Sequence, residues 1–75
     1  MITGDPVLDN FATRLTQLRL ECGLNKHQLS IKAGLDWQRI KMFENGKVLP
    51  SLKSLLQLSR ALGVSLDELV GVEDQ

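Results

Sequence analysis

The chain has 75 residues, which is enough for one small domain with a single hydrophobic core and argues against an enzyme with a deep cleft. Hydrophobic residues make up 43% and charged residues 24% of the sequence, as in a folded chain and not in a disordered one. A single cysteine and a single histidine argue against disulfides and against a metal site. We therefore expect no enzymatic activity, no metal and no cofactor.

The whole chain, residues 1–75, is expected to form one domain, with a core from about residue 8 to residue 71 and short flexible ends. No apolar run approaches the roughly 18 residues that span a bilayer. The first ten residues, MITGDPVLDN, lack the basic and then apolar layout of a signal peptide. These observations predict a cytoplasmic protein.

The charges balance to zero over the chain but are unevenly distributed. Residues 24–60 contain seven Lys and Arg residues and two Asp and Glu residues, a net charge of +5. Residues 61–75 contain four acidic residues and no basic residue, a net charge of −4, and residues 1–23 carry −1. The middle of the chain can thus face phosphates while the acidic end faces away from them.

A first helix is predicted by apolar residues that recur at steps of three and four. The residues of this stripe are Leu8, Phe11, Leu15, Leu18 and Cys22. Asp5 followed by Pro6 can begin the helix, and Asp9 is an equally good later start. Gly23 fits the left-handed residue that ends helices. Because Cys22 lies on the apolar stripe, it is expected to be a small core residue.

Two short helices follow, each with a recognisable beginning and end. Asn25 can cap the second helix, with Gln28 reaching back as in a capping box, and Gly34 ends it. The third helix begins after Asp36 and ends at Asn45-Gly46. The apolar residues expected to pack around these helices are Leu24, Leu29, Leu35, Ile40 and Phe43.

The last two helices are predicted in the same way. Ser51 caps the fourth helix and Gly63 ends it, whereas Ser65 and Glu68 form the capping box of a fifth helix that ends at Gly71. The inward residues expected on the fourth helix are Leu52, Leu55, Leu56, Ser59 and Leu62. No segment alternates with period two for long enough to form a strand. The sequence thus predicts an all-α domain of five short helices.

The second and third helices are too short to be stable alone and are joined by residues 33–36, so they must cross steeply and pack on a shared core. This arrangement leaves the third helix, from about Trp37 to Asn45, protruding. Its outward residues are Trp37, Gln38, Arg39, Lys41 and Met42. Such a mixture of hydrogen-bonding, cationic and apolar groups is typical of a recognition helix that meets base edges in the major groove.

From about Leu8 to Gly71 the sequence resembles the Cro and phage-repressor class of helix-turn-helix proteins, the XRE family. The motifs that carry the resemblance stand in register over this length. They are Leu18-Arg19 ahead of Cys22-Gly23-Leu24, Leu29 to Gly34-Leu35, Ile40 to Phe43-Glu44-Asn45-Gly46-Lys47, Pro50-Ser51-Leu52, and Leu62-Gly63-Val64-Ser65-Leu66-Asp67-Glu68-Leu69. The resemblance implies a lambda-repressor-like fold with its helix-turn-helix at the second and third helices, in a regulator that binds duplex DNA.

The resemblance also implies which residues touch DNA. The implied base contacts are Trp37, Gln38, Arg39 and Met42, and the implied phosphate contacts are Asn25, Lys26, Lys41, Asn45 and Lys47. Gln38 and Arg39 suit adenine and guanine respectively. Trp37 departs from the family pattern, because a bulky indole stands where members of the family often carry a small or amide residue. An indole donates one hydrogen bond, so Trp37 suits a thymine methyl or a sugar edge; packing against the neighbouring helix is the alternative. The cations interpreted as solvated surface charges are Lys32, Lys53 and Arg60.

Glu44 stands in the middle of a unit that is expected to face DNA, where an exposed carboxylate would repel phosphate. The resemblance implies that Arg19 pairs with Glu44. Such a partly buried ion pair would tie the first helix to the end of the third.

The main hypothesis is sequence-specific binding to an inverted-repeat operator as a homodimer, with repression or other regulation of transcription. The residues expected at the dimer surface are Leu66, Leu69, Val70 and Val72, with Leu66 and Leu69 alternatively assigned to the core. Two variants share this chemistry: the controller of a restriction-modification or phage system, and the antitoxin of a toxin–antitoxin pair. A rival hypothesis is a protein-interaction module that does not bind DNA, which the zero net charge favours and the +5 segment disfavours.

Overall fold

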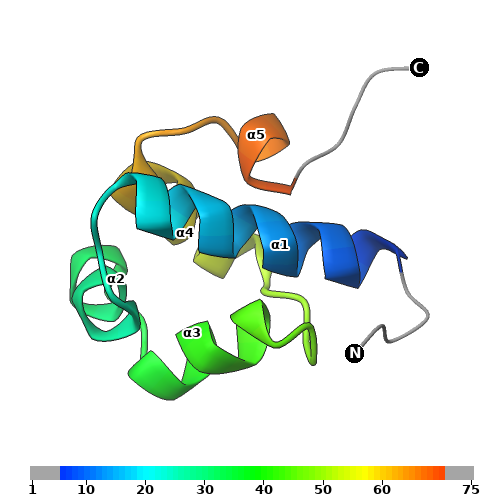
Figure 1. Ribbon diagram of the computed structural model, residues 1–75, viewed down its shortest axis with the longest axis horizontal. Coiled ribbons are helices and arrows are strands. Elements are labelled where there is room, and N and C mark those ends of the chain that lie inside the picture. Colours follow the sequence, from blue (N-terminus) through cyan, green and yellow to red (C-terminus); the bar gives the residue numbers. More distant parts are fainter. Residues whose placement is uncertain (1–5, 71–75) are drawn as a thin grey trace.

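The computed structural model describes residues 6–70, with side chains from residue 8, and contains five α-helices and no strand over this range (Figure 1). The helices are α1 (Pro6–Glu21), α2 (Lys26–Ala33), α3 (Trp37–Glu44), α4 (Leu52–Leu62) and α5 (Leu66–Val70). The predicted all-α architecture is confirmed, and each helix lies where its sequence signals placed it. The expected boundary residues Asp5 and Gly71 lie outside the described residues.

The longest helix, α1, crosses the middle of the molecule and packs against α3 and α5, whereas α2 packs against α3 and α4 (Figure 1). Figure 1 shows α5 on one side of α1, with α2 and α3 on the other. This separation places the helix-turn-helix pair away from the last described helix. None of the helices between residues 6 and 70 is long and apolar enough to cross a membrane.

Side-chain capping marks the beginning of α2 and of α4. The Gln28 backbone N–H donates to Asn25 Oδ1 over 2.7 Å, and the Asn25 backbone N–H donates to Gln28 Oε1 over 2.9 Å, which confirms the predicted capping box of α2. Ser51 caps α4 by accepting from the Ser54 backbone N–H over 3.2 Å. Asp36 is the N-cap residue of α3, but its side chain makes no capping hydrogen bond.

The turn between α2 and α3 depends on Gly34. This residue has φ +70° and ψ 33°, in the left-handed region that an L side chain rarely adopts. Its backbone N–H donates to the carbonyl of Ile31, and the next N–H, of Leu35, donates to the carbonyl of Ser30 over 2.9 Å. The last carbonyls of α2 are thereby satisfied within a turn short enough to bring α3 across α2.

The core gathers residues from all five helices. Phe11 of α1 meets Phe43 of α3 edge to face, with ring centroids 6.2 Å apart and an interplanar angle of 68°. The residues buried to less than 2% exposure are Phe11, Phe43, Leu15, Leu29, Ile40, Leu58 and Leu69. Because Ile40 and Phe43 both enter this core, α3 is fixed with its opposite face outward.

The predicted inward face of α4 is wrong in part. Leu52, the first residue of α4, is 65% exposed, whereas Leu58 is completely buried. Leu58 lies on a different stripe of the helix from the one predicted. Leucines occupy both stripes, so apolar spacing alone could not decide which of them faces the core.

Two further predicted positions are corrected by the structure. Cys22 is exposed, because α1 ends at Glu21 and Cys22 stands in the turn that follows. Leu69 is completely buried, which confirms its alternative assignment to the core and removes it from the predicted dimer surface, while Leu66 and Val70 of the same helix are half-buried. Val72, the fourth residue predicted for that surface, lies outside the described residues.

Candidate nucleic-acid interface

The outward face of α3 carries the residues predicted to meet base edges. Ile40 and Phe43 hold the helix on the core, and the remaining side chains on the far face are in contact with solvent. The exposed residues of α3 are Trp37, Gln38, Arg39, Lys41 and Met42. Trp37 and Met42 are 42% and 41% exposed, so two large apolar side chains stand in water beside polar ones. Isolated exposed apolar residues are ordinary, but two on one short helix fit a surface that binds a partner.

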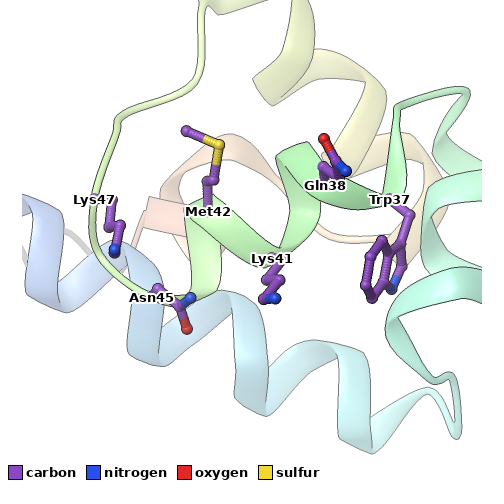
Figure 2. Close-up of a pocket in the computed structure, with 6 residues that line it drawn as sticks. All are labelled: Trp37, Gln38, Lys41, Met42, Asn45 and Lys47. Carbon is purple, nitrogen blue, oxygen red and sulfur yellow. The ribbon is translucent and has the colours of Figure 1, made fainter.

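A shallow open cavity of about 250 Å³ runs along this face (Figure 2). It is lined by Trp37, Gln38, Lys41, Met42, Asn45 and Lys47, none of which is acidic. Figure 2 shows Trp37, Lys41 and Asn45 projecting to one side of α3, and Gln38 and Met42 projecting to the other. The surface therefore combines amides, cations, an indole and a thioether in one hollow.

Trp37 contacts Lys41, the residue one helical turn further along. The Lys41 Nζ lies 5.5 Å from the centroid of the indole ring. This distance is within the range of a cation–π interaction. A cation and an aromatic face therefore lie side by side at the edge of the hollow.

Arg39 lies apart from the other three predicted base-contact residues. It lines a second cavity, of about 350 Å³, between the turn that precedes α3 and the beginning of α4. The other residues of that cavity are Gly34, Leu35, Asp36, Ser51, Lys53, Ser54 and Gln57. The structure thus brings Trp37, Gln38 and Met42 together in one hollow and places Arg39 in the other.

Lys53, interpreted from the sequence as a solvated surface charge, becomes a candidate through its place in the structure. It is exposed on the first turn of α4 and lines the same cavity as Arg39, so two cations border this hollow. The sequence feature that could have identified Lys53 is its position two residues after the cap Ser51, in the first turn of a helix whose dipole attracts anions. Only the folded arrangement of α4 beside the turn at Asp36 relates it to α3.

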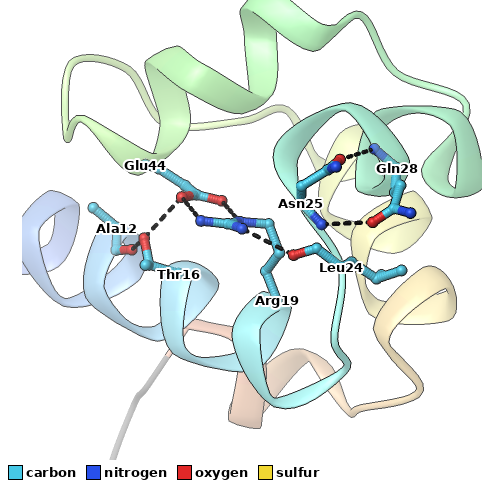
Figure 3. A network of polar contacts seen from close by, with 7 residues as sticks. All are labelled: Ala12, Thr16, Arg19, Leu24, Asn25, Gln28 and Glu44. Carbon is cyan, nitrogen blue, oxygen red and sulfur yellow. Dashed lines mark hydrogen bonds and ion pairs between the residues drawn. The ribbon is translucent and has the colours of Figure 1, made fainter.

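The ion pair predicted between Arg19 and Glu44 is present and is part of a larger network (Figure 3). Arg19 donates from Nε to Glu44 Oε2 over 2.6 Å and from Nη2 to Glu44 Oε1 over 3.0 Å. Thr16 Oγ1 also donates to Glu44 Oε1 over 3.0 Å, and Arg19 Nη1 donates to the Leu24 carbonyl over 2.9 Å. The network joins α1, the end of α3 and the segment that leads into α2, and it neutralises the acidic residue of α3.

The five predicted phosphate contacts stand at helix ends and on the edge of α3. Asn25 uses its Oδ1 to cap α2, which leaves its Nδ2 hydrogens to donate to another acceptor. Lys26 is half-buried at the first residue of α2, and Asn45 and Lys47 are exposed just after α3. Over the described residues, no group of three or more His, Cys, Asp and Glu side chains is placed to hold a metal ion.

The helix-turn-helix family model matches residues 15–69. The chain belongs to the helix-turn-helix family. The HTH-type transcriptional regulator y4dJ of Sinorhizobium fredii is 36% identical over 66 residues, which cover 88% of this chain and 80% of that protein. The match confirms the family resemblance on which the predicted contacts depend.

Solved structures of helix-turn-helix proteins share the fold. The restriction-modification controller protein C.AhdI from Aeromonas hydrophila is 35% identical with a TM-score of 0.79, and the match covers 83% of this chain and 94% of that one. The controller protein C.Esp1396I, solved as a tetramer on its natural 35 base-pair operator, is 26% identical with a TM-score of 0.79, covering 88% of this chain and 91% of that one. The predicted five-helix fold of this helix-turn-helix chain is thereby confirmed.

Proposed function

We propose that this helix-turn-helix protein binds duplex DNA with sequence specificity and regulates transcription, with α3 inserted into the major groove. The observation that carries the proposal is the outward face of α3: a hollow of polar, cationic and apolar side chains without a carboxylate. The one acidic residue of α3, Glu44, is paired with Arg19 and removed from that face. A surface of this composition suits base edges and phosphates at once.

Base readout is assigned to four residues of α3. Gln38 suits adenine and Arg39 suits guanine, because each offers two hydrogen-bonding atoms that match the major-groove edge of its base. Met42 and Trp37 offer apolar contact to thymine methyl groups or sugar edges. Since Arg39 borders a different hollow from Gln38, the two residues are expected to read different base pairs of one half-site.

Phosphate contacts hold α3 in register. We assign them to Asn25 and Lys26 at the beginning of α2, to Lys41 on α3, and to Asn45 and Lys47 after α3. Contacts to the backbone set the position and orientation of a protein on the duplex but carry little sequence information. They also make the affinity depend strongly on salt.

The protein is proposed to bind as a two-fold dimer on an inverted repeat, because a single recognition helix covers only a few base pairs. The half-buried Leu66 and Val70 of α5 support a dimer surface there, without the buried Leu69. The operator complex of C.Esp1396I, which holds a tetramer, supports assembly on DNA in a similar fold. Repression in the cytoplasm, without enzymatic activity, is the form of regulation that we propose.

A role as controller of a restriction-modification system is the variant that a specific observation favours. C.AhdI and C.Esp1396I are both controllers of this kind and both match more than four fifths of this chain. Genes for a restriction endonuclease and its methyltransferase beside the gene for this protein would support the variant. A toxin gene in that place would favour an antitoxin instead.

The experiment that tests DNA binding is selection of bound duplexes from a random pool by the purified protein. The parent should enrich an inverted repeat, and a Gln38→Ala, Arg39→Ala double variant should lose or alter the preference at defined base positions. Arg60→Ala is the matched control, since Arg60 is an exposed cation of α4 outside both hollows. No enrichment at low salt would contradict the proposal and favour a protein-interaction module.

A further inference from the structure

Trp37 and Lys41 contact each other on the outward face of α3. The two residues stand one helical turn apart, and the ammonium lies 5.5 Å from the centre of the indole. Both side chains are exposed and line the hollow of α3. The contact therefore belongs to the surface proposed to meet DNA and not to the core.

The neighbouring carboxylate does not compete for this lysine. Glu44, three residues after Lys41, accepts from Arg19 at both of its oxygens and from Thr16 at Oε1. The ion pair that Glu44 makes is with Arg19, and the Lys41 ammonium lies against the aromatic face of Trp37. Among residues 8–70, no carboxylate pairs with the Lys41 ammonium, so its positive charge is open to a phosphate.

We propose that Trp37 is a positioning residue for Lys41, holding its ammonium against a backbone phosphate at one edge of α3. In Figure 2 the two side chains project to the same side of the helix, away from Gln38 and Met42. An ammonium is a compact charge on a flexible stem, so an aromatic face that restricts the stem reduces the entropy lost on binding. This role rests on the proposed DNA binding and is additional to the apolar contact with DNA that is assigned to Trp37 above.

The test compares two duplexes of equal length: the duplex selected from the random pool and a scrambled version of it. The scrambled duplex presents the same backbone without the operator sequence, so it isolates phosphate contacts. Lys41→Gln should weaken binding to both duplexes and reduce the slope of log K against log salt by about one for each bound protomer. Trp37→Leu should weaken binding to the scrambled duplex by about two- to fivefold, and Trp37→Phe should retain most of the affinity.

Coupling between the two substitutions separates positioning from an independent contact. In the Lys41→Gln background, Trp37→Leu should cause no further loss on the scrambled duplex. Lys53→Gln is the matched control, because Lys53 is an exposed lysine of the other hollow, and the Trp37→Leu effect should persist in that background. An equal effect of Trp37→Leu in both backgrounds, or no effect in the parent, overturns the positioning role.

A measurement on the free protein checks the contact without DNA. In the parent, the ring current of the indole should shift the Lys41 side-chain proton resonances upfield, and Trp37→Leu should abolish that shift. Lys41 resonances at the same positions in the parent and in Trp37→Leu overturn the inference.

The binding experiments distinguish two failures. If the parent binds neither duplex at low salt, the proposed function and the phosphate contact are both overturned. If the parent and Trp37→Leu bind both duplexes with equal affinity, only the role of Trp37 is overturned.

Discussion

Arg19 and Glu44 are joined by two hydrogen bonds, Nε to Oε2 over 2.6 Å and Nη2 to Oε1 over 3.0 Å, and this pair fixes α3 to α1. The Glu44 side chain is 4% exposed and that of Arg19 is 10% exposed. A bidentate pair of this kind has both strength and a defined orientation. The acidic residue at the end of the proposed recognition helix is therefore neutralised inside the protein instead of repelling DNA.

Arg19→Met should destabilise the fold by about 3–5 kcal/mol, because it leaves the buried Glu44 carboxylate without its cation. The free energy of unfolding in urea measures the loss. The Arg19→Met, Glu44→Met double variant is the control and should lose less than the single variant, since it leaves no unpaired charge. Equal stability of Arg19→Met and the parent would show that the pair contributes nothing.

The N-cap residues of α2 and α3 differ in their hydrogen bonds, so replacing each of them should lower the stability of the protein by a different amount. Asn25→Ala removes the acceptor of the Gln28 N–H and should cost about 0.5–2 kcal/mol. Asp36→Ala, at the equivalent position of α3, should cost less because the Asp36 side chain makes no capping hydrogen bond. Urea unfolding without DNA compares them. A larger loss for Asp36→Ala than for Asn25→Ala would refute this difference between the caps.

Two leucines of α4 provide a matched pair for the core. Leu58→Ala opens a cavity at a completely buried site and should destabilise the protein by about 2–5 kcal/mol. Leu52→Ala makes the same chemical change at a residue that is 65% exposed, and it should alter stability by about 0.5 kcal/mol or less. Thermal or urea unfolding of both variants is the measurement. Similar losses would mean that α4 is rotated from the described orientation.

The signals that predicted the fold correctly are local ones. Capping by Asn25 and Ser51, and termination by Gly34, depend on atoms within four residues of one another, so the sequence contains all the information needed. The inward face of α4 depends on which helices pack against it. Its leucines permit two faces, and only the packing on α2 and α5 selects the one that includes Leu58.

As for the fold, the parts of the candidate site that depend on local sequence were predictable, and those that depend on the packing of distant segments were not. The outward residues of α3 follow from its period once Ile40 and Phe43 are assigned to the core. The separation of Arg39 from Gln38, and the approach of Lys53 to Arg39, follow from the placement of α4 beside the turn, which no local pattern encodes. The pair of Arg19 with Glu44 came from the family resemblance, because 25 positions separate the two residues.

The salt dependence of binding tests the phosphate contacts and the dimer together. Lys26, Lys41 and Lys47 are the charged members of the proposed set, so one protomer on B-DNA should give a slope of log K against log salt of about −3 and two protomers about −5. Lys47→Gln should then reduce the slope by about two if a dimer binds, because the lysine is lost from both protomers, and by about one if a monomer binds. Sedimentation equilibrium of the same complex supplies the number of protomers independently. A slope near zero would show that these lysines do not contact phosphates. A protein that sediments as a monomer, both free at high concentration and on DNA, would refute the proposed dimer.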